Sequence, residues 1–334
     1  MSEEMYDLTI IGGGPVGMFA AFYAGLQELH TQVIESMPAV GGQIAALYPE
    51  KQILDVAGFS GVTGEQLISK LHQQLTEFPV DIKTGTTVTN VSGQLGDFTV
   101  TTDQGVTHSK TVLITTGNGA FTPRPLAVEN AATFENKNLW YFMPKLDHFR
   151  GHSVMVAGGG DAAIDIALML EPVASQVYLM HRRNEFRALP HNVTKLAESS
   201  VEQVTPYLAQ ALTATANDRV TVDLKEMKTD NHRELTVDDL VVNFGFVSDH
   251  SVFENWTLQF DQYRQQVAVD SSMKTSVDGV YAAGDTANYE GKVALIATGF
   301  GEAATAVHAA AFAANPQHRG PVHSTSVHLP KQEG

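Results

Sequence analysis

A glycine-rich turn between an apolar strand and a helix occurs twice in this chain, and this repeat constrains the fold most. The first copy reads Leu8-Thr-Ile-Ile-Gly12-Gly-Gly14-Pro-Val-Gly17, and the second reads Ser153-Val-Met-Val-Ala-Gly158-Gly-Gly160-Asp-Ala-Ala163. The offset is 146 residues at every matched pair: Gly12 and Gly158, Gly14 and Gly160, Gly17 and Ala163, Glu35 and His181. The repeat predicts two βαβ units of one kind.

The spacing in the first copy is typical of a site for a dinucleotide. Gly12 permits the tight turn, Gly14 permits close approach of the backbone to a pyrophosphate, and Gly17 lets the helix pack on the strand. The helix start then presents free N–H groups and a positive dipole end to the phosphates. Glu35 ends the second strand, where an acid accepts hydrogen bonds from a ribose. A glycine turn without a nucleotide is the alternative.

The second copy differs at the residue that reads the ribose. His181 replaces the acid and is followed by Arg182 and Arg183, with Arg187 four residues further on. Because a guanidinium pairs with phosphate through two hydrogen bonds, this site should prefer NADP over NAD. A solvated basic turn is the alternative. The predicted NADP residues are Gly158, Gly160, Asp161, Ala162, His181, Arg182, Arg183 and Arg187.

The composition narrows the classes of function. The chain has 334 residues, a formal net charge of −16 and no cysteine. The acidic balance argues against a nucleic-acid partner. Without cysteine there is no disulfide, thiolate nucleophile or C-x-x-C pair, so electrons would have to reside on a bound organic cofactor. We expect no metal site.

The N-terminal residues and the hydropathy of the chain predict its location in the cell. The first residues, Met-Ser-Glu-Glu-Met, are acidic and do not resemble a signal peptide. No apolar run approaches the ~20 residues that cross a bilayer. We therefore expect a cytoplasmic protein with no membrane partner.

The proline- and glycine-rich segment 116–125 and the short segment 244–249 flank the second copy and predict the domain boundaries. The expected fold is α/β, with two Rossmann-like domains: residues 122–246 are inserted into a domain formed by 1–121 and 247–334. After the insertion, a strand over 275–283 delivers Gly284 and Asp285 at its carboxyl end, where open α/β sheets bind ligands. A helix is expected from Val293 to about Ala314. For Asp285, an exposed acid closing a turn is the alternative.

Together these motifs resemble the two-dinucleotide flavoproteins of the thioredoxin-reductase-like type, over nearly the whole chain. In that group the first fold binds FAD, and the inserted fold binds NADPH. The matching motifs here are Gly12–Gly17, Gly41–Gln43, Ala283–Asp285, Gly158–Ala163 and His181–Arg183. The resemblance thus implies an FAD-binding domain at 1–121 and 247–334 and an NADPH-binding domain at 122–246.

The chain differs from the thioredoxin reductases of that group in one motif. Thioredoxin reductases carry a C-x-x-C pair in the NADPH domain, and this chain has no cysteine. Its tail, Pro321-Val-His323-Ser-Thr325-Ser, resembles the extension of the ferredoxin–NADP reductases of this type. In those enzymes a tail histidine and a tyrosine stack on opposite faces of the flavin, and the matching residues are His323 and Tyr48. The resemblance also places Gly42, Gln43, Val88, Phe121, Gly284, Asp285 and Thr325 at the FAD site.

The resemblance implies a reversible reaction: hydride transfer from NADPH to FAD, followed by single-electron transfer to ferredoxin or flavodoxin. No acid–base residue is required, and the family suggests a homodimer. Because ferredoxins are usually acidic, we expect the basic residues of the tail (315–334) to dock the carrier. One alternative is an NADPH oxidase or diaphorase of the same fold that reduces oxygen or a quinone. The other is a flavin-binding redox sensor without turnover.

Overall fold

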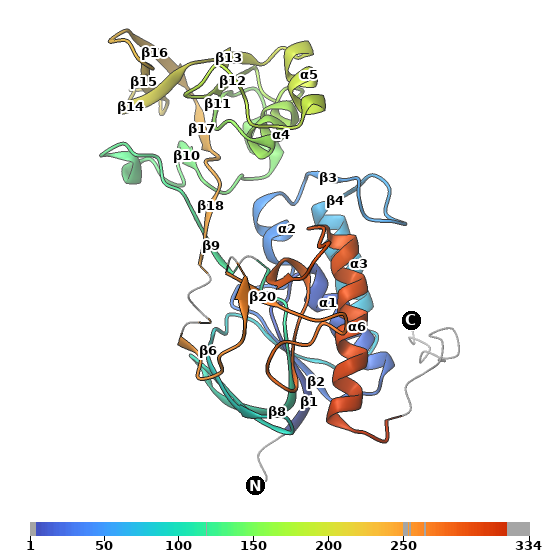
Figure 1. The fold of residues 1–334 in the computed structure, drawn as a ribbon. Coiled ribbons are helices and arrows are strands. Elements are labelled where there is room, and N and C mark those ends of the chain that lie inside the picture. Colours follow the sequence, from blue (N-terminus) through green and yellow to red (C-terminus); the bar gives the residue numbers. More distant parts are fainter. Residues whose placement is uncertain (1–4, 118, 250–252, 254, 264, 319–334) are drawn as a thin grey trace. The chain divides into compact units, whose positions relative to one another are not determined.

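A computed structural model describes residues 5–117, 119–249, 253, 255–263 and 265–318 (Figure 1). The chain forms two compact units, one made of residues 1–120 and 248–334 and the other of residues 121–247. We call them the discontinuous unit and the inserted unit. No described helix has both the length and the apolarity needed to span a bilayer.

The discontinuous unit is built on a seven-stranded sheet. Its strands are β1 (Met5–Ile11), β2 (Thr31–Ile34), β5 (Asp81–Lys83), β6 (Val88–Gln94), β7 (Asp97–Thr102), β8 (Gly105–Ile114) and β21 (Val280–Ala282). The order is β5-β2-β1-β8-β7-β6, with β21 also paired to β8. β1 runs parallel to β2 and β8, with Leu8 opposite Thr31 and Thr111. The carboxyl ends of these strands therefore meet at one edge of the sheet.

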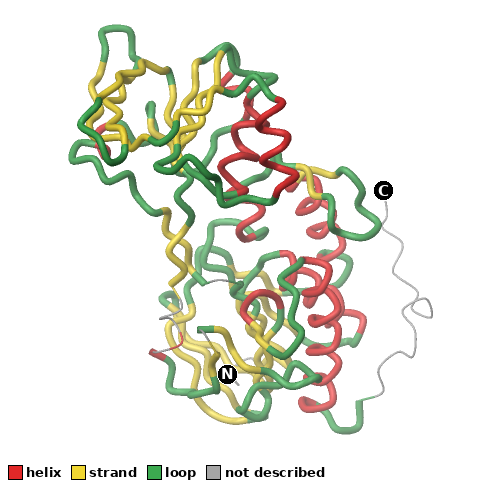
Figure 2. The backbone as a smooth tube through the Cα atoms, turned by 45° about the horizontal axis from the view of Figure 1, so that its top comes forward, coloured by secondary structure: helices red, strands yellow, loops and turns green. Residues whose placement is uncertain are grey.

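Three helices cover one face of this sheet: α1 (Pro15–Leu26), α3 (Gly64–Leu75) and α6 (Ile296–Ala314). The red helices of this unit stand together beside its yellow strands in Figure 2. Proline occupies the first turn of α1, where its missing N–H is not needed. A capping box closes the start of α3, since the Thr63 hydroxyl accepts the Gln66 N–H at 3.2 Å. Leu67, Leu71 and Leu75 fill the core below α3.

A second apolar cluster lies elsewhere in the discontinuous unit. Trp256 is fully buried and meets the rings of Phe253 and Phe260 edge-on, next to Phe98 of β7. The shorter elements of the unit are α2 (Gly42–Leu47), β3 (Gln52–Ile53), β4 (Val62–Thr63), β19 (Gln262–Tyr263), β20 (Gln266–Ala268), η4 (Gly284–Thr286) and β22 (Ala287–Asn288).

The inserted unit contains a five-stranded parallel sheet in the order β10-β17-β11-β12-β13. Its strands are β10 (Leu139–Trp140), β11 (Ser153–Ala157), β12 (Gln176–Met180), β13 (Glu202–Val204) and β17 (Asp239–Val242), and its helices are α4 (Asp161–Leu170) and α5 (Pro190–Glu198). An antiparallel sheet of β14 (Tyr207–Ala214), β15 (Val220–Glu226) and β16 (His232–Val237) packs within the same unit. The short 3-10 helices are η1 (Ala131–Thr133) and η2 (Leu146–Phe149).

The connections between the units are β9 (Ala120–Pro123) and β18 (Phe246–Asp249), which pair with each other. They lie within the two segments that the sequence marks as boundaries. One sequence expectation differs from the structure: α6 begins at Ile296 rather than Val293. Leu295 has extended backbone angles (φ −130°, ψ 150°), and residues 292–295 are not helical.

Candidate functional site: two dinucleotide-binding turns

The turn after β1 requires glycine at two positions for steric reasons. Gly12 has φ +109°, and a Cβ there would lie 2.5 Å from the Thr115 carbonyl oxygen. A Cβ at Gly17 would collide with the Gly12 carbonyl oxygen. Gly14 is different, because no atom lies within 4 Å of its Cβ position. As the N-cap of α1, Gly14 leaves open space at the helix start, where an anion can approach the free N–H groups.

Glu35 is held directly against this turn. Its side chain is buried, Oε2 accepts the Gly13 N–H at 2.7 Å, and Oε1 accepts the Met37 N–H at 2.8 Å. Oε1 also accepts the Ser36 hydroxyl at 3.3 Å, so Oε2 is the oxygen that keeps a lone pair for one further hydrogen bond. The structure places the acid at the turn, and its contact with a ribose stays a prediction.

The Gly41-Gly42-Gln43 segment packs on the same turn. The Gly41 N–H donates to the Gly13 carbonyl at 2.8 Å, and a Cβ at Gly42 would lie 3.1 Å from the Gly14 Cα. Both glycines have positive φ, 123° and 55°, which other residues rarely adopt. Gln43 follows in α2, so Gly42 and Gln43 join Gly14 at the candidate site.

The Gly284–Asp285 loop and the starts of α1 and α6 meet at Val16. A Cβ at Gly284 would lie 3.1 Å from the Val16 Cγ2, and a Cβ at Gly299 would lie 2.5 Å from the same atom. Gly284 directly follows β21 and its neighbour Ala283, at the carboxyl edge of the sheet. Two helix N-termini and the Asp285 loop are thereby gathered at one place.

Tyr48, the residue after α2, is electrostatically linked to that loop. Burial raises the pKa of the Tyr48 hydroxyl, and the negative charges of Asp285 and Asp55 raise it further. The side chain is half-buried and packs at the edge of the core. Tyr48 therefore belongs to the same group of residues as Asp285. Val88, by contrast, is the first residue of β6 and is buried in the apolar cluster of Phe98 and Trp256.

Three of the predicted FAD residues cannot be placed by side chain. His323 and Thr325 lie outside the described residues, and only the backbone of Phe121, in β9, is described. Their contacts with a flavin stay predictions.

In the inserted unit, the second turn repeats the steric pattern. A Cβ at Gly158 would lie 2.6 Å from the Ala163 Cβ, and a Cβ at Gly159 would collide with the His181 ring. Gly160 is the N-cap of α4. A Cβ at Gly160 would have one neighbour within 4 Å, the Arg187 carbonyl oxygen at 3.8 Å. The helix start is open to an anion, as in the first turn.

The first two residues of α4 differ in their surroundings. The Asp161 carboxylate accepts the Leu189 N–H at 2.8 Å and the Asn192 side-chain N–H at 2.8 Å, so it secures the start of α5. Ala162 is exposed on the first turn of α4. Asp161 thus has a structural role that the motif alone does not reveal.

Positive charge surrounds the second turn. The backbone N–H of Arg187 donates to the Gly159 carbonyl at 2.7 Å, which fixes this arginine beside the turn. Arg182, Arg183 and Arg187 are exposed, and none forms an ion pair within the described part of the chain. Burial lowers the pKa of His181, and the charges of Arg182 and Arg183 lower it further. The His181 Nε2 is buried without a hydrogen-bond partner among the described residues.

The sequence analysis missed a buried network below Gly284. Glu302 of α6 accepts the Gly284 N–H through Oε2 at 2.8 Å and the Tyr289 hydroxyl through Oε1 at 2.7 Å. Lys292 forms an ion pair with Glu302 and donates to the Gly284 carbonyl at 2.9 Å. The signal was present in the sequence as the single charged residue of an otherwise apolar, alanine-rich helix.

The fold and the two turns define a class of protein. The family described as pyridine nucleotide-disulphide oxidoreductase matches residues 6–311, and the chain belongs to this family. Two solved structures share the predicted fold, each with a TM-score of 0.77 at 23% identity and covering 92% of this chain. They are the thioredoxin reductases of T. acidophilum, of which 98% is covered, and of Lactococcus lactis, of which 99% is covered.

Curated relatives are more similar. The ferredoxin–NADP reductase of Lactiplantibacillus plantarum is 52% identical over 328 residues, which cover 98% of this chain and 99% of that protein. The ferredoxin–NADP reductase of Limosilactobacillus reuteri (strain DSM 20016) is 52% identical over 332 residues, which cover 99% of this chain and 100% of that protein. These findings confirm the family that the motifs resembled.

Proposed function

We propose that this chain is an FAD-dependent ferredoxin–NADP reductase. The observation that carries the proposal is the pair of dinucleotide turns with opposite charge, Glu35 at one and three unpaired arginines at the other, in a chain without cysteine. The names of the relatives support the same activity. Because the chain has no cysteine, it has no thiol pair of its own through which electrons could pass to the acceptor.

The discontinuous unit is the proposed FAD-binding domain. Its turn fits the pyrophosphate because Gly14 leaves the α1 start open. The proposed FAD residues are Gly12, Gly14, Gly17, Glu35, Gly42, Gln43, Tyr48, Val88, Phe121, Gly284, Asp285 and Thr325, with Tyr48 and His323 stacking on the flavin. A bound flavin supplies the exchange between two-electron and one-electron transfer.

The inserted unit is the proposed NADPH-binding domain. The guanidinium groups of Arg182, Arg183 and Arg187 would pair with the 2′-phosphate, and the α4 start would hold the pyrophosphate. The proposed residues are Gly158, Gly160, Asp161, Ala162, His181, Arg182, Arg183 and Arg187. These residues bind and orient, and no acid–base step is assigned to any of them.

Stopped-flow reduction of the bound flavin tests the proposal. NADPH should bleach the flavin much faster than NADH, and ferredoxin should reoxidise it under anaerobic conditions. A flavin that NADPH does not bleach would indicate a sensor without turnover. Reoxidation by oxygen or a quinone, but not by ferredoxin or flavodoxin, would indicate an oxidase or diaphorase.

Two further features stay predictions: a homodimer, which the resemblance suggests, and a cytoplasmic location, which the sequence suggests. Light scattering of the purified protein tests the first, and fractionation of the producing cell tests the second.

A further inference from the structure

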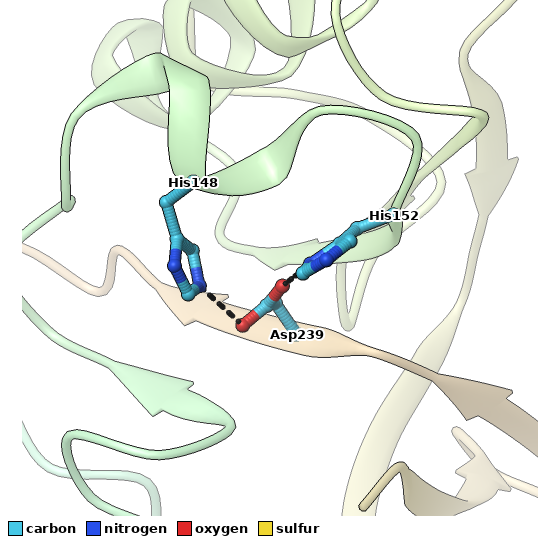
Figure 3. A group of neighbouring side chains, drawn as sticks. All are labelled: His148, His152 and Asp239. Carbon is cyan, nitrogen blue, oxygen red and sulfur yellow. Dashed lines mark hydrogen bonds and ion pairs between the residues drawn. The ribbon is translucent and has the colours of Figure 1, made fainter. Parts of the chain in front are cut away.

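A cluster of metal-ligating side chains lies in the inserted unit, away from the arginines. Figure 3 shows the imidazoles of His148 and His152 on either side of the Asp239 carboxylate, both pointing toward it. The His148 Nε2 is 3.1 Å from Oδ1, and the His152 Nδ1 is 2.7 Å from Oδ2. One ligand atom of each residue lies within 4.8 Å of the others.

The backbone brings these residues together at the amino edge of the parallel sheet. His148 belongs to η2, His152 immediately precedes β11, and Asp239 is the first residue of β17. β11 and β17 are neighbours, with Val154 opposite Asp239. Gly158 and the nucleotide turn follow the other end of β11, on the order of 15 Å away for five residues of strand. The cluster is therefore separate from the proposed NADPH site.

Burial and orientation of the carboxylate favour a bound cation. Asp239 is 2% exposed, and a buried carboxylate requires compensating partners. The Trp140 Nε1–H donates to Oδ1 at 2.7 Å, which fixes the orientation of the carboxylate in the way that outer-shell groups fix metal ligands. The His148 and His152 side chains are 35% and 40% exposed, so an ion from solvent can reach both.

The donor set selects the class of ion. Two imidazole nitrogens and one carboxylate oxygen suit Zn²⁺, whereas Mg²⁺ and Ca²⁺ prefer sets of oxygen ligands. Tetrahedral Zn²⁺ with bonds of about 2.0–2.1 Å places its ligand atoms about 3.3 Å apart. The ligand atoms already lie within 4.8 Å of one another, so the partly exposed histidine side chains need only draw closer to meet this geometry.

We propose that His148, His152 and Asp239 form a Zn²⁺ site, with water as the fourth ligand. No metal site was expected from the sequence. Asp239 is 87 residues from His152, and the pairing of β11 with β17 brings the two residues together. The bound ion would join the η2–β11 segment to β17 and would stabilise the inserted unit.

Metal titration of the untagged, flavin-loaded protein, stripped with a chelator, tests the proposal. Zn²⁺ in competition with a chromophoric indicator should bind with one tight equivalent per chain and raise the melting temperature, whereas Mg²⁺ should do neither. His148→Gln and His152→Gln should each weaken Zn²⁺ binding at least about tenfold. The matched control is His232→Gln, because His232 pairs with Asp223 at 2.8 Å and has no second histidine beside that carboxylate.

A measurement on the unaltered chain keeps the test independent of the variants. Co²⁺ should replace Zn²⁺ and give the intense visible absorption bands of a tetrahedral site. The absence of a tight Zn²⁺ equivalent would show that the three side chains form only a hydrogen-bonded cluster, and would overturn the proposal. Equal affinity in the histidine variants, or only the weak bands of octahedral Co²⁺, would overturn it as well.

Discussion

The Gly13 N–H donates a hydrogen bond of 2.7 Å to Glu35 Oε2, so the acid at the end of β2 is part of the turn that follows β1. This contact gives Glu35 a role in the fold that does not depend on a ribose. The hydrogen bond fixes the position of the carboxylate before a ligand binds.

Replacing Glu35 with alanine should destabilise the protein. The substitution leaves the Gly13 N–H, a buried donor, without its partner, at a cost of about 1–3 kcal/mol in unfolding free energy. Urea unfolding of the flavin-free protein measures this change. Glu290→Ala is the control, because Glu290 is exposed in the same unit. An unchanged midpoint in Glu35→Ala would show that another group satisfies the Gly13 donor.

Substitutions of two glycines in the first turn should affect the stability of the protein and its affinity for FAD differently. Gly17→Ala forces a Cβ into the Gly12 carbonyl and should lower the unfolding free energy by about 1–3 kcal/mol or more. Gly14→Ala has room in the protein and an ordinary φ of −70°, so stability should hold while FAD affinity falls. Flavin titration and urea unfolding of both variants check this contrast. Equal FAD affinity in Gly14→Ala would contradict the placement of the pyrophosphate.

Removing the guanidinium groups should affect NADPH and leave NADH unchanged. Each charge-assisted hydrogen bond contributes about 1.5–3 kcal/mol, so Arg182→Ala with Arg183→Ala, which removes at least two such bonds, should raise the KM for NADPH by at least about a hundredfold. Steady-state kinetics with both coenzymes measures the effect. Arg233→Ala provides the control, since Arg233 is already paired with Glu202 at 2.7 Å. A similar rise in the KM for NADH would contradict a 2′-phosphate contact.

The ionisation of Tyr289 should lower the free energy of unfolding at high pH. The pKa of Tyr289 is raised to about 12 from its usual value of 10.0. Burial is the largest cause, and the hydrogen bond to Glu302 and the negative charge of Glu302 add to it. The folded state therefore retains a proton that the unfolded chain loses, so this contribution is full below pH 10 and is lost as the pH rises toward 12.

Urea unfolding across that pH range measures the slope. Tyr289→Phe should flatten the alkaline decline without abolishing it, because the pKa of Tyr281 is also raised to about 12, mainly by burial. Tyr263→Phe is the control, since Tyr263 is exposed. An equally steep decline in Tyr289→Phe would show that other groups cause it.

Local chemistry explains which parts of the fold could be predicted from the sequence. The positive φ of Gly12 and the close approach of Gly17 to the Gly12 carbonyl are local to the first turn, so the motif identifies this turn without distant segments. The helix that the motif predicts after the second turn is α4, and its N-cap is Gly160, the last glycine of that turn.

Features that depend on distant segments could not be predicted. Glu302 and Gly284 are 18 residues apart, and their hydrogen bond forms only because α6 packs beside the end of β21. The antiparallel sheet β14–β16 was not predicted either, although Val220, Val222 and Leu224 of β15 are buried in alternation with polar residues. The surroundings of Asp239 could not be predicted because its partners, His148 and His152, lie 91 and 87 residues away in the chain, in η2 and just before β11.

The Gly159–His181 contact has a consequence for protein engineering. Since glycine at position 159 leaves its whole side-chain volume to residue 181, the strand end can accept a different residue without any rebuilding of the loop before α4. The first turn already holds an acid in that relation, with the Glu35 Cβ 3.2 Å from the Cβ position of Gly13. We therefore expect the residue at the strand end to set the proposed coenzyme preference separately from the glycine turn that is proposed to hold the pyrophosphate.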